Sequence, residues 1–413
     1  MAISTGNPPS ARLLDITRLI SRVGRGPPTG VDRVELAYLS RLSSDSVPLF
    51  LLARSSLGFV LMGGAAARPL LDRITGITPW GAADLLSRLA RFSEPDRAAA
   101  EADLRRLSLD RCRPAGLRGM LRKHLPRGTA YLNVGHSNLE AGTLAAIRDL
   151  PDMRIAVLVH DTIPLDHPEF SARGVPQRFA AKLAAIGKHA DLVICNSHAT
   201  AADVQRHLAP RGRVPPLIRA HLGIDPPCPD FDALAQRPAP GRPWFVTVGT
   251  IEPRKNHALL LKVWQDLSDE MAAPPLLFIV GRRGWRNEDV FRMLDTAPFM
   301  ERSVFEMNNL SDGGLAALVS GARALLFPSL AEGYGLPPLE AAALGVPVLA
   351  TDLAVYREVL GDFAVYLDGR DPYSWRKKII ELTRDTGTTG SAESARLAVP
   401  AWADHFDIVL GHT

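Results

Sequence analysis

Short apolar runs alternate with longer amphipathic stretches along most of this chain. In the first half, the apolar runs predict strands at residues 13–16, 48–53, 129–134, 154–160, 191–196 and 216–222. Apolar positions with a period of about 3.6 residues predict helices at 31–39, 82–92, 98–107, 139–149, 179–189 and 199–207. Strands and helices that alternate in this way are typical of a parallel sheet covered on both faces.

A proline-rich stretch at residues 225–243 interrupts this alternation, and we interpret it as an interdomain linker. Beyond it, strands are expected at 244–249, 276–281, 303–306, 322–327, 346–350 and 364–367. Helices are expected at 257–269, 288–294, 315–320, 339–344 and 373–384, with a last one near 402–410. The pattern predicts an α/β protein with two Rossmann-like, doubly wound domains that face one cleft. These are residues 1–224 and 244–390, followed by a helical segment at 391–413.

Two glutamates eight positions apart, Glu332 and Glu340, bracket a turn between a predicted strand and a predicted helix. Gly333 and Gly335 let the backbone turn tightly and approach a ligand, and Pro337 suits the first turn of a helix. Such a turn points free backbone N–H groups at an anion, and phosphate is the usual occupant. Carboxylates beside a phosphate are unfavourable unless they hold hydroxyls or a cation. The turn therefore indicates a phosphate ligand that carries a sugar.

Two adjacent cations, Arg254 and Lys255, follow the first predicted strand of the second half. Ligands of open α/β sheets bind at the carboxyl ends of strands. A guanidinium fork and an ammonium point charge can neutralise one diphosphate together. Alone, such a pair is also typical of a solvated loop. Combined with the turn at Glu332, it predicts a phosphate site with two sides.

Several segments resemble a retaining GT-B glycosyltransferase, and glycosyltransferase family 4 in particular. In the second half these are GTIEPRKN at 249–256, IVG at 279–281 and EGYGLPPLEA at 332–341. In the first half they are VHDTIP at 159–164, HPEF at 167–170 and NSHAT at 196–200. The resemblance is dense over residues 154–367 and thin over residues 1–130. It implies a GT-B fold whose first domain binds the acceptor, whose second binds a nucleotide-sugar donor, and whose last helix packs back on the first domain.

The resemblance also implies a role for each matching residue. Lys255 and Arg254 would neutralise the donor diphosphate as it leaves, and Glu340 would accept hydrogen bonds from the ribose hydroxyls. Glu332 would contact the transferred sugar, and His160 would reach that sugar from the opposite domain. A histidine at a strand end is also typical of a structural residue. The rest of the expected donor site comprises the backbone N–H groups of Tyr334, Gly335 and Leu336, with Thr250, Gly281 and Gly333.

Two positions depart from the family pattern. Gly30 matches a Gly-rich loop where many members have a Gly-Gly pair, so it is only loosely matched to a diphosphate contact. Thr250 stands where many members place the first phosphate-binding arginine, and Arg254 would substitute for it. No metal or other cofactor is expected, because the two cations supply the charge. Asp230 and Asp232, which form the Asp-x-Asp of the linker, are interpreted as chance.

The implied function is transfer of a hexose from a nucleotide-sugar donor, with mannose from GDP-mannose as the first choice. The acceptor would be a saccharide or a lipid-linked saccharide in the synthesis of bacterial surface polysaccharide. Two alternatives stay open: a GT-B sugar-nucleotide epimerase, and a binding subunit that holds the nucleotide sugar without turnover. An NAD-dependent oxidoreductase is disfavoured because no Gly-x-Gly-x-x-Gly follows a predicted strand.

Composition limits where the protein acts. The hydrophobic content is 46% and the charged content 22%, which is typical of globular proteins, and no apolar run is long enough for a bilayer span. Three scattered cysteines and an N-terminus unlike a signal peptide predict a cytoplasmic protein. Residues 105–127 are strongly basic and contain an amphipathic helical pattern. This segment fits either contact with the inner membrane surface or a solvated basic face packed on its own domain. The lack of interleaved aromatic residues argues against nucleic acid.

Overall fold

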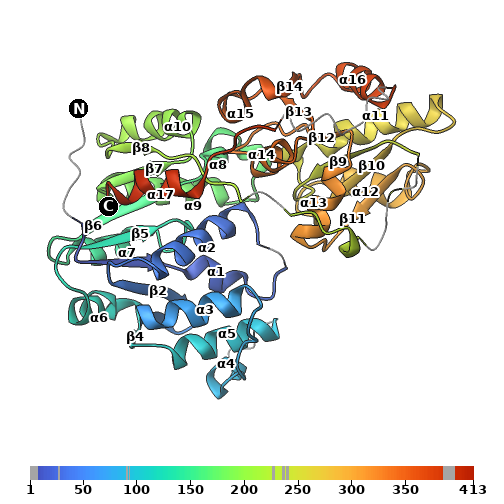
Figure 1. Cartoon of the computed structure of the whole chain (residues 1–413). Coiled ribbons are helices and arrows are strands. Elements are labelled where there is room, and N and C mark those ends of the chain that lie inside the picture. The colour runs from blue at the N-terminus through green and yellow to red at the C-terminus, as the bar shows by residue number, and fades with distance from the viewer. Residues whose placement is uncertain are drawn as a thin grey trace.

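The computed structural model describes residues 8–26, 28–89, 92, 94–225, 228–234, 238, 241–384 and 396–413, without the side chains of residues 88 and 89. Within these residues the chain forms two α/β domains that lie side by side, the first blue to green and the second mainly yellow to orange (Figure 1). This arrangement confirms the prediction of two Rossmann-like domains.

In the described part of the first domain, eight strands form a sheet in the order β4-β3-β2-β1-β5-β6-β7-β8. They are β1 (Ala11–Asp15), β2 (Leu49–Ser55), β3 (Gly58–Gly63), β4 (Asp110–Cys112), β5 (Thr129–Asn133), β6 (Arg154–Val159), β7 (Leu192–Cys195) and β8 (Leu217–Arg219). The six predicted strands are present and parallel. The pattern missed β3 and β4, which pair antiparallel at the edge. Because β3 follows β2 as a hairpin, no helix separates the two apolar runs.

The helices of the first domain cover the two faces of its sheet. They are α1 (Thr17–Arg22), α2 (Gly30–Ser43), α3 (Ala67–Ile74), α4 (Leu85–Leu89), α5 (Pro95–Arg106), α6 (Leu117–His124), α7 (Ala141–Arg148), α8 (Ile163–Asp166), α9 (Val175–His189) and α10 (His198–Leu208). Successive residues of a strand enter different cores: Leu14 and Leu158 belong to one cluster, and Leu13 and Val157 to the other. Burial on both faces explains why these strands are continuously apolar in the sequence.

The second domain contains a parallel sheet in the order β11-β10-β9-β12-β13-β14. Its strands are β9 (Trp244–Val248), β10 (Leu276–Val280), β11 (Val304–Met307), β12 (Ala324–Phe327), β13 (Val348–Thr351) and β14 (Ala364–Leu367). Its helices are α11 (His257–Glu270), α12 (Glu288–Thr296), α13 (Asp312–Ser320), α14 (Leu336–Ala343), α15 (Ala354–Leu360) and α16 (Pro372–Arg384). All six predicted strands are confirmed, whereas α15 was not predicted.

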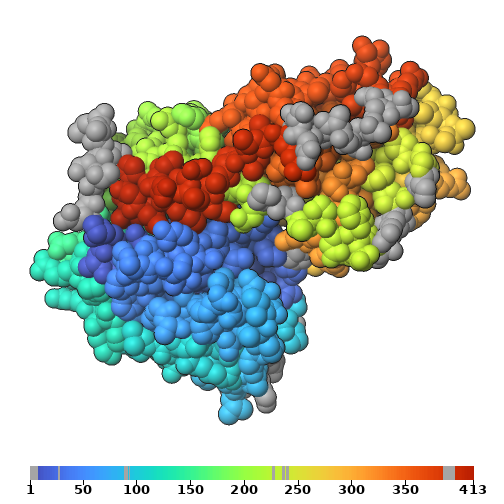
Figure 2. All heavy atoms as spheres, viewed as in Figure 1, coloured from blue at the N-terminus to red at the C-terminus, as the bar shows by residue number. Residues whose placement is uncertain are grey.

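The last helix, α17 (Trp402–Leu410), returns to the first domain. It lies as a red band between the blue and green parts of that domain (Figure 2). The Tyr38 hydroxyl on α2 is hydrogen-bonded to His405 Nε2 at 2.8 Å, and Ile224 N–H donates to the Pro400 carbonyl at 2.9 Å. The expectation that the last helix packs back on the first domain is therefore confirmed.

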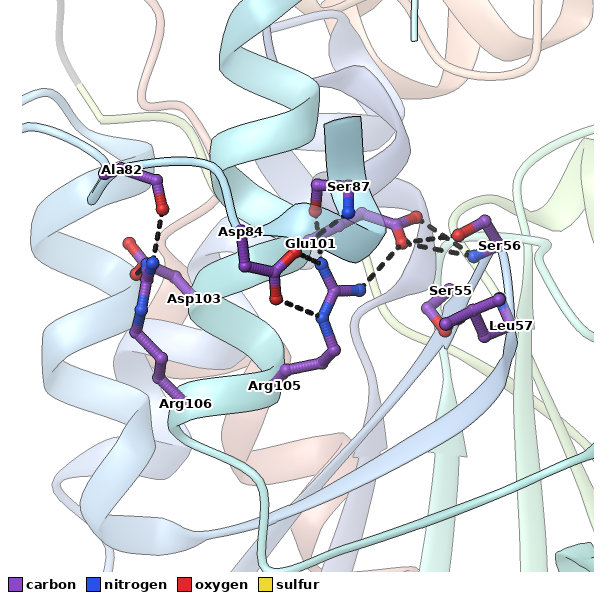
Figure 3. Close-up of polar contacts among 10 residues, drawn as sticks. All are labelled: Ser55, Ser56, Leu57, Ala82, Asp84, Ser87, Glu101, Asp103, Arg105 and Arg106. Carbon is purple, nitrogen blue, oxygen red and sulfur yellow. Dashed lines mark hydrogen bonds and ion pairs between the residues drawn. The ribbon is translucent and has the colours of Figure 1, made fainter. Parts of the chain in front are cut away.

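Arg105, which begins the basic segment 105–127, is not part of a solvated face. Arg105 is 6% exposed and forms a fork with Asp84 on one side, at 2.7 and 2.6 Å (Figure 3). On its other side lies the buried Glu101, which also accepts from the Ser56 N–H and hydroxyl (Figure 3). This arginine ties α4 and the β2–β3 hairpin to α5, so it has a structural role.

The apolar face of α6 is buried in the core of its own domain. Leu117, Met120 and Leu121 are at most 5% exposed and belong to one core cluster. Insertion of this face into a bilayer would require the helix to leave its core, so the burial favours the interpretation of a solvated basic face packed on its own domain. Contact of this segment with a membrane stays a prediction. The surface of this segment presents its charged side chains, of which Lys123 is paired with Asp110 at 2.9 Å.

Candidate donor-binding site

Two cations lie on the loop after β9, at the carboxyl end of the second sheet. A short 3₁₀ turn, Pro253–Lys255, places them side by side, and Asn256 follows with a positive φ of 56°. Asparagine tolerates this left-handed conformation. Its side chain donates to the carbonyls of Pro328 and Gly369, at 3.2 and 2.8 Å. The loop that carries the cations is therefore anchored to two other loops of the same domain.

Arg254 and Lys255 converge on the first glutamate of the predicted turn. Lys255 Nζ lies 2.5 Å from Glu332 Oε1, and Arg254 Nη1 lies 2.7 Å from the same oxygen. Arg254 also contacts Glu252 at 2.7 Å and donates to the Ala331 carbonyl at 2.8 Å. The structure thus brings together the predicted cations and Glu332, in a cluster of two cations and two carboxylates.

Burial and charge act in opposite directions in this cluster. Burial alone would raise the pKa of Glu332, but Arg254 and Lys255 outweigh it and lower that pKa from 4.5 to about 2. Burial lowers the pKa of Lys255, because the attraction of Glu332 offsets it only in part. Glu332 is therefore ionised at neutral pH. A phosphate that binds Lys255 would have to replace this carboxylate as its partner.

The turn after Glu332 requires its two glycines. Gly335 precedes α14 with φ of +109°, and a Cβ there would lie 2.8 Å from the ring of Tyr356. A Cβ on Gly333 would collide with the carbonyl of His160, which belongs to the first domain. Gly333 thus permits a close approach of the two domains, in addition to the tight turn that the sequence indicated.

The start of α14 has the features of an anion site. The backbone N–H groups of Tyr334, Gly335 and Leu336 donate to no residue in the described part of the chain. They lie at the positive end of the helix, where such donors favour a negative charge. The Tyr334 side chain points away from this site, because its hydroxyl donates to the Leu222 carbonyl at 2.9 Å. Binding of phosphate by the three N–H groups stays a prediction.

Thr250 and Gly281 lie at the same edge of the sheet. A Cβ on Gly281 would collide with the Gly249 carbonyl, so the loops after β9 and β10 touch there. A Cβ on Gly249 would in turn lie 3.1 Å from Lys255 Cε. Among the described residues, no group of three or more His, Cys, Asp or Glu side chains is arranged to hold a metal ion.

His160 follows β6 and faces the second domain with its backbone. The residue is 6% exposed, and its side chain is hydrogen-bonded through Nε2 to the Val134 carbonyl at 2.7 Å. Burial lowers its pKa to about 4, so the imidazole is neutral at pH 7. Since Nε2 then carries the proton, Nδ1 is an acceptor. A contact between His160 and a transferred sugar stays a prediction, in which Nδ1 would accept a hydroxyl.

Several contacts close the two domains on each other near this site. A Cβ on Gly30, the first residue of α2, would lie 3.2 Å from Leu336 Cδ1. Arg282 Nη1 donates to the Arg25 carbonyl at 2.9 Å, across the same gap. The structure therefore places the loosely matched Gly30 against the start of α14, while its contact with a diphosphate stays a prediction.

Three residues at the cleft were absent from the predicted site. Arg33 on α2 forms an ion pair with Glu340 on α14, and Arg282 spans the cleft as described. Asp161 lines a cavity of about 230 Å³ with Glu332, between the two domains. Burial raises the pKa of Asp161, although Arg254 opposes this shift. Asp161 could have been found beside His160, and Arg282 beside Gly281, but nothing in the helical pattern singles out Arg33.

Comparison with known proteins finds a family match and curated relatives for part of this chain. Residues 232–396 match the family described as "Glycosyl transferases group 1". The chain is 35% identical over 237 residues to the serotype-specific mannosyltransferase WbdA of Escherichia coli. This match covers 54% of the present chain and 29% of WbdA. It is 33% identical over 139 residues to the O-antigen chain mannosyltransferase RfbU of Salmonella typhimurium, covering 33% of this chain and 37% of RfbU. The matches thus span less than half of either relative.

Solved structures match over nearly the whole chain. HepE from Anabaena, in complex with UDP and glucose, has a TM-score of 0.58 and 16% identity, and the match covers 98% of this chain and 97% of HepE. WaaG, a glycosyltransferase involved in lipopolysaccharide biosynthesis, has a TM-score of 0.52 and 15% identity, with 96% and 95% covered. At these identities the likeness shows a shared fold.

Proposed function

Because residues 232–396 form a glycosyltransferase group 1 domain within a GT-B fold, we propose that this protein is a retaining hexosyltransferase. Its donor is a nucleotide sugar, with GDP-mannose as the first candidate, since WbdA and RfbU are both named mannosyltransferases. Its acceptor is a saccharide or a lipid-linked saccharide. The name of RfbU further supports a role in the synthesis of bacterial surface polysaccharide.

One observation carries this proposal. Arg254 and Lys255 are both paired with Glu332, which lies two residues before the first of the open N–H groups at the start of α14. This combination suits a ligand with both a diphosphate and hydroxyl groups. Fixed donors aimed at a leaving group stabilise the charge that develops on it, and one such donor is typically worth about 10²–10³ in rate.

The reaction that follows from this site needs no protein nucleophile. The bond between the anomeric carbon and the phosphate oxygen breaks, and its electron pair stays on the diphosphate, next to Lys255 and Arg254. The acceptor oxygen forms the new bond on the same face of the sugar. Because the acceptor attacks from the face that the diphosphate leaves, the configuration is retained. The acceptor's proton passes to the departing phosphate oxygen. Glu332 and the neutral His160 would hold sugar hydroxyls during this step.

The place of action follows from the proposed acceptor. In the described residues, no helix is long and apolar enough to cross a bilayer. A lipid-linked saccharide would be met at the cytoplasmic face of the membrane. Because the apolar face of α6 is buried, an attraction to anionic lipid would depend on exposed cations such as Arg118, 55% of whose side chain is exposed. Such an attraction weakens as salt is added.

A donor panel tests the proposed function. GDP-mannose, UDP-glucose, UDP-N-acetylglucosamine and dTDP-sugars are incubated with the purified protein, with and without simple mannosides and glucosides as acceptors. Transfer or slow hydrolysis with release of one nucleoside diphosphate is expected. Interconversion of a UDP-sugar without acceptor would establish the epimerase instead. Saturable binding of a nucleotide sugar without turnover, for any acceptor, would establish the binding subunit.

A further inference from the structure

Arg33 reaches the donor-binding domain from the other half of the molecule. It lies in the first turns of α2, and its Nη1 is paired with Glu340 Oε1 on α14. The start of α2 is firmly held, because Asp32 completes a capping box with Thr29 and lies 2.6 Å from Arg18 Nε. The guanidinium is thus presented to the second domain from a fixed helix end.

Packing around this ion pair shows that it belongs to the closed interface. Gly30 lies one helical turn before Arg33, and a Cβ on it would be 3.2 Å from Leu336, at the start of α14. The side chain of Arg33 is 39% exposed and that of Glu340 is 15% exposed. Both line a narrow cavity of about 40 Å³ beside α13, in which Arg33 is the residue from the first domain and the other lining residues belong to the second. A ligand that enters there meets both side chains.

The geometry leaves part of the Glu340 carboxylate for a ligand. Arg33 contacts Oε1, whereas Oε2 makes no hydrogen bond to a described residue. A carboxylate has about four lone-pair sites on its two oxygens, so a guanidinium and a hydroxyl can be bound together. Burial raises the pKa of Glu340, and Arg33 opposes that shift. Without Arg33 the side chain would lose both its fixed orientation and a cation that keeps it ionised.

We propose that Arg33 is a positioning residue of the donor site, supplied by the opposite domain, which orients Glu340 to accept the ribose hydroxyls of the donor. This rests on the proposed function, which assigns Glu340 to the ribose. Because Arg33 and Glu340 are on different domains, the ribose site is complete only when the domains are closed. Recognition of the nucleotide and closure of the cleft are then one event.

The test compares ribonucleotides with their 2′-deoxy counterparts, because only the ribose hydroxyl distinguishes them. Calorimetric titration measures GDP against dGDP, and UDP against dUDP, on the full chain. The variants are Glu340→Gln, Arg33→Met and Arg33→Lys. The control is Arg41→Met, since Arg41 lies on the same helix, is similarly exposed at 41%, and pairs with Asp45 of its own domain.

The wild-type protein is expected to prefer the ribonucleotide by about tenfold, as for a hydrogen bond to a charged group. Glu340→Gln and Arg33→Met should each reduce this preference to less than twofold. Arg33→Lys should restore part of it, and Arg41→Met should leave it unchanged. As the pH is lowered, the remaining preference of Arg33→Met for the ribonucleotide should disappear at a higher pH than the preference of the wild type. The reason is that Glu340 is protonated more easily without the Arg33 cation.

Three outcomes would overturn the inference and locate the error. If the wild type binds neither GDP nor UDP, the proposed function fails, and the role of Arg33 with it. If Glu340→Gln keeps the preference, the assignment of Glu340 to the ribose is wrong. Arg33 does not position Glu340 if Arg33→Met keeps the preference for the ribonucleotide while Glu340→Gln loses it. The same conclusion follows if Arg33→Met binds the ribonucleotide more tightly than the wild type does.

Discussion

The two glutamates of the donor turn obtain their cations from different halves of the molecule. Glu332 is paired with Arg254 and Lys255, which lie on the loop after β9 of its own domain. Glu340 is paired with Arg33, which lies on α2 of the opposite domain. The cations of Glu332 are therefore in place when the second domain folds, whereas that of Glu340 depends on the contact between domains. The ion pairs of Glu332 thus form within one domain, whereas the ion pair of Glu340 forms only when the two domains are in contact.

The largest effect is expected for the cation that Glu332 shares with the ligand. Lys255→Ala removes a charge from the leaving diphosphate, so the rate of sugar transfer should fall by about 10²–10³. Lys262→Ala is the matched control, because Lys262 is an exposed lysine on the adjacent α11, paired with Asp266. Transfer rates at saturating donor measure both. Equal rates for Lys255→Ala and the wild type would remove Lys255 from the reaction.

An effect of similar size is expected on stability, and it should separate the two glutamates. Glu332→Ala leaves two buried cations without their shared carboxylate, which should lower the free energy of unfolding by about 3–5 kcal/mol. Glu340→Ala should cost less, because its partner Arg33 is 39% exposed. Urea denaturation measures both variants. Added nucleoside diphosphate should raise the free energy of unfolding more in Glu332→Ala than in the wild type. Equal losses of stability in Glu332→Ala and Glu340→Ala would contradict the difference between the two glutamates.

The smallest effect is the pH dependence, and here the glutamates should differ in sign. The pKa of Glu332 is lowered to about 2, so its contribution to stability is present above its unfolded pKa of 4.5 and is lost as the pH falls toward 2. That loss amounts to about 3 kcal/mol. The pKa of Glu340 is raised by burial, so its protonation favours the folded state as the pH falls.

Glu332→Gln should therefore flatten the loss of stability on acidification, and Glu340→Gln should steepen it. The free energy of unfolding, measured in urea between about pH 3 and pH 7, gives both slopes. A shift of the same sign in the two variants would show that their surroundings do not differ as described.

The same contrast explains how much of the molecule could be predicted from its sequence. Local patterns were sufficient for the parallel strands and for the cluster around Glu332, because each of its residues follows a strand of one sheet. They were insufficient for β3 and α15, whose apolar residues lie too close to neighbouring elements to show a separate period. They could not decide between the two interpretations of α6, since an amphipathic helix has the same pattern whether it covers a core or a membrane.

The parts of the site that were missed depend on contacts between domains. Arg33 and Glu340 are more than three hundred positions apart, and a lone arginine on an amphipathic helix is most often solvated. Gly333 was expected to serve only its turn and the ligand, yet it also makes room for the carbonyl of His160. Such pairings are set by how two folded domains meet, which no local pattern encodes.

We propose above all that the turn from Glu332 to Glu340 binds the diphosphate and the ribose of a nucleotide sugar. A crystal structure with the bound nucleoside diphosphate tests it most directly. We expect the phosphates at Lys255 Nζ and at the N–H groups that begin α14, with Lys255 released from Glu332 and the ribose on Glu340. A nucleotide bound elsewhere, or one that leaves the Lys255–Glu332 pair intact, would contradict the account.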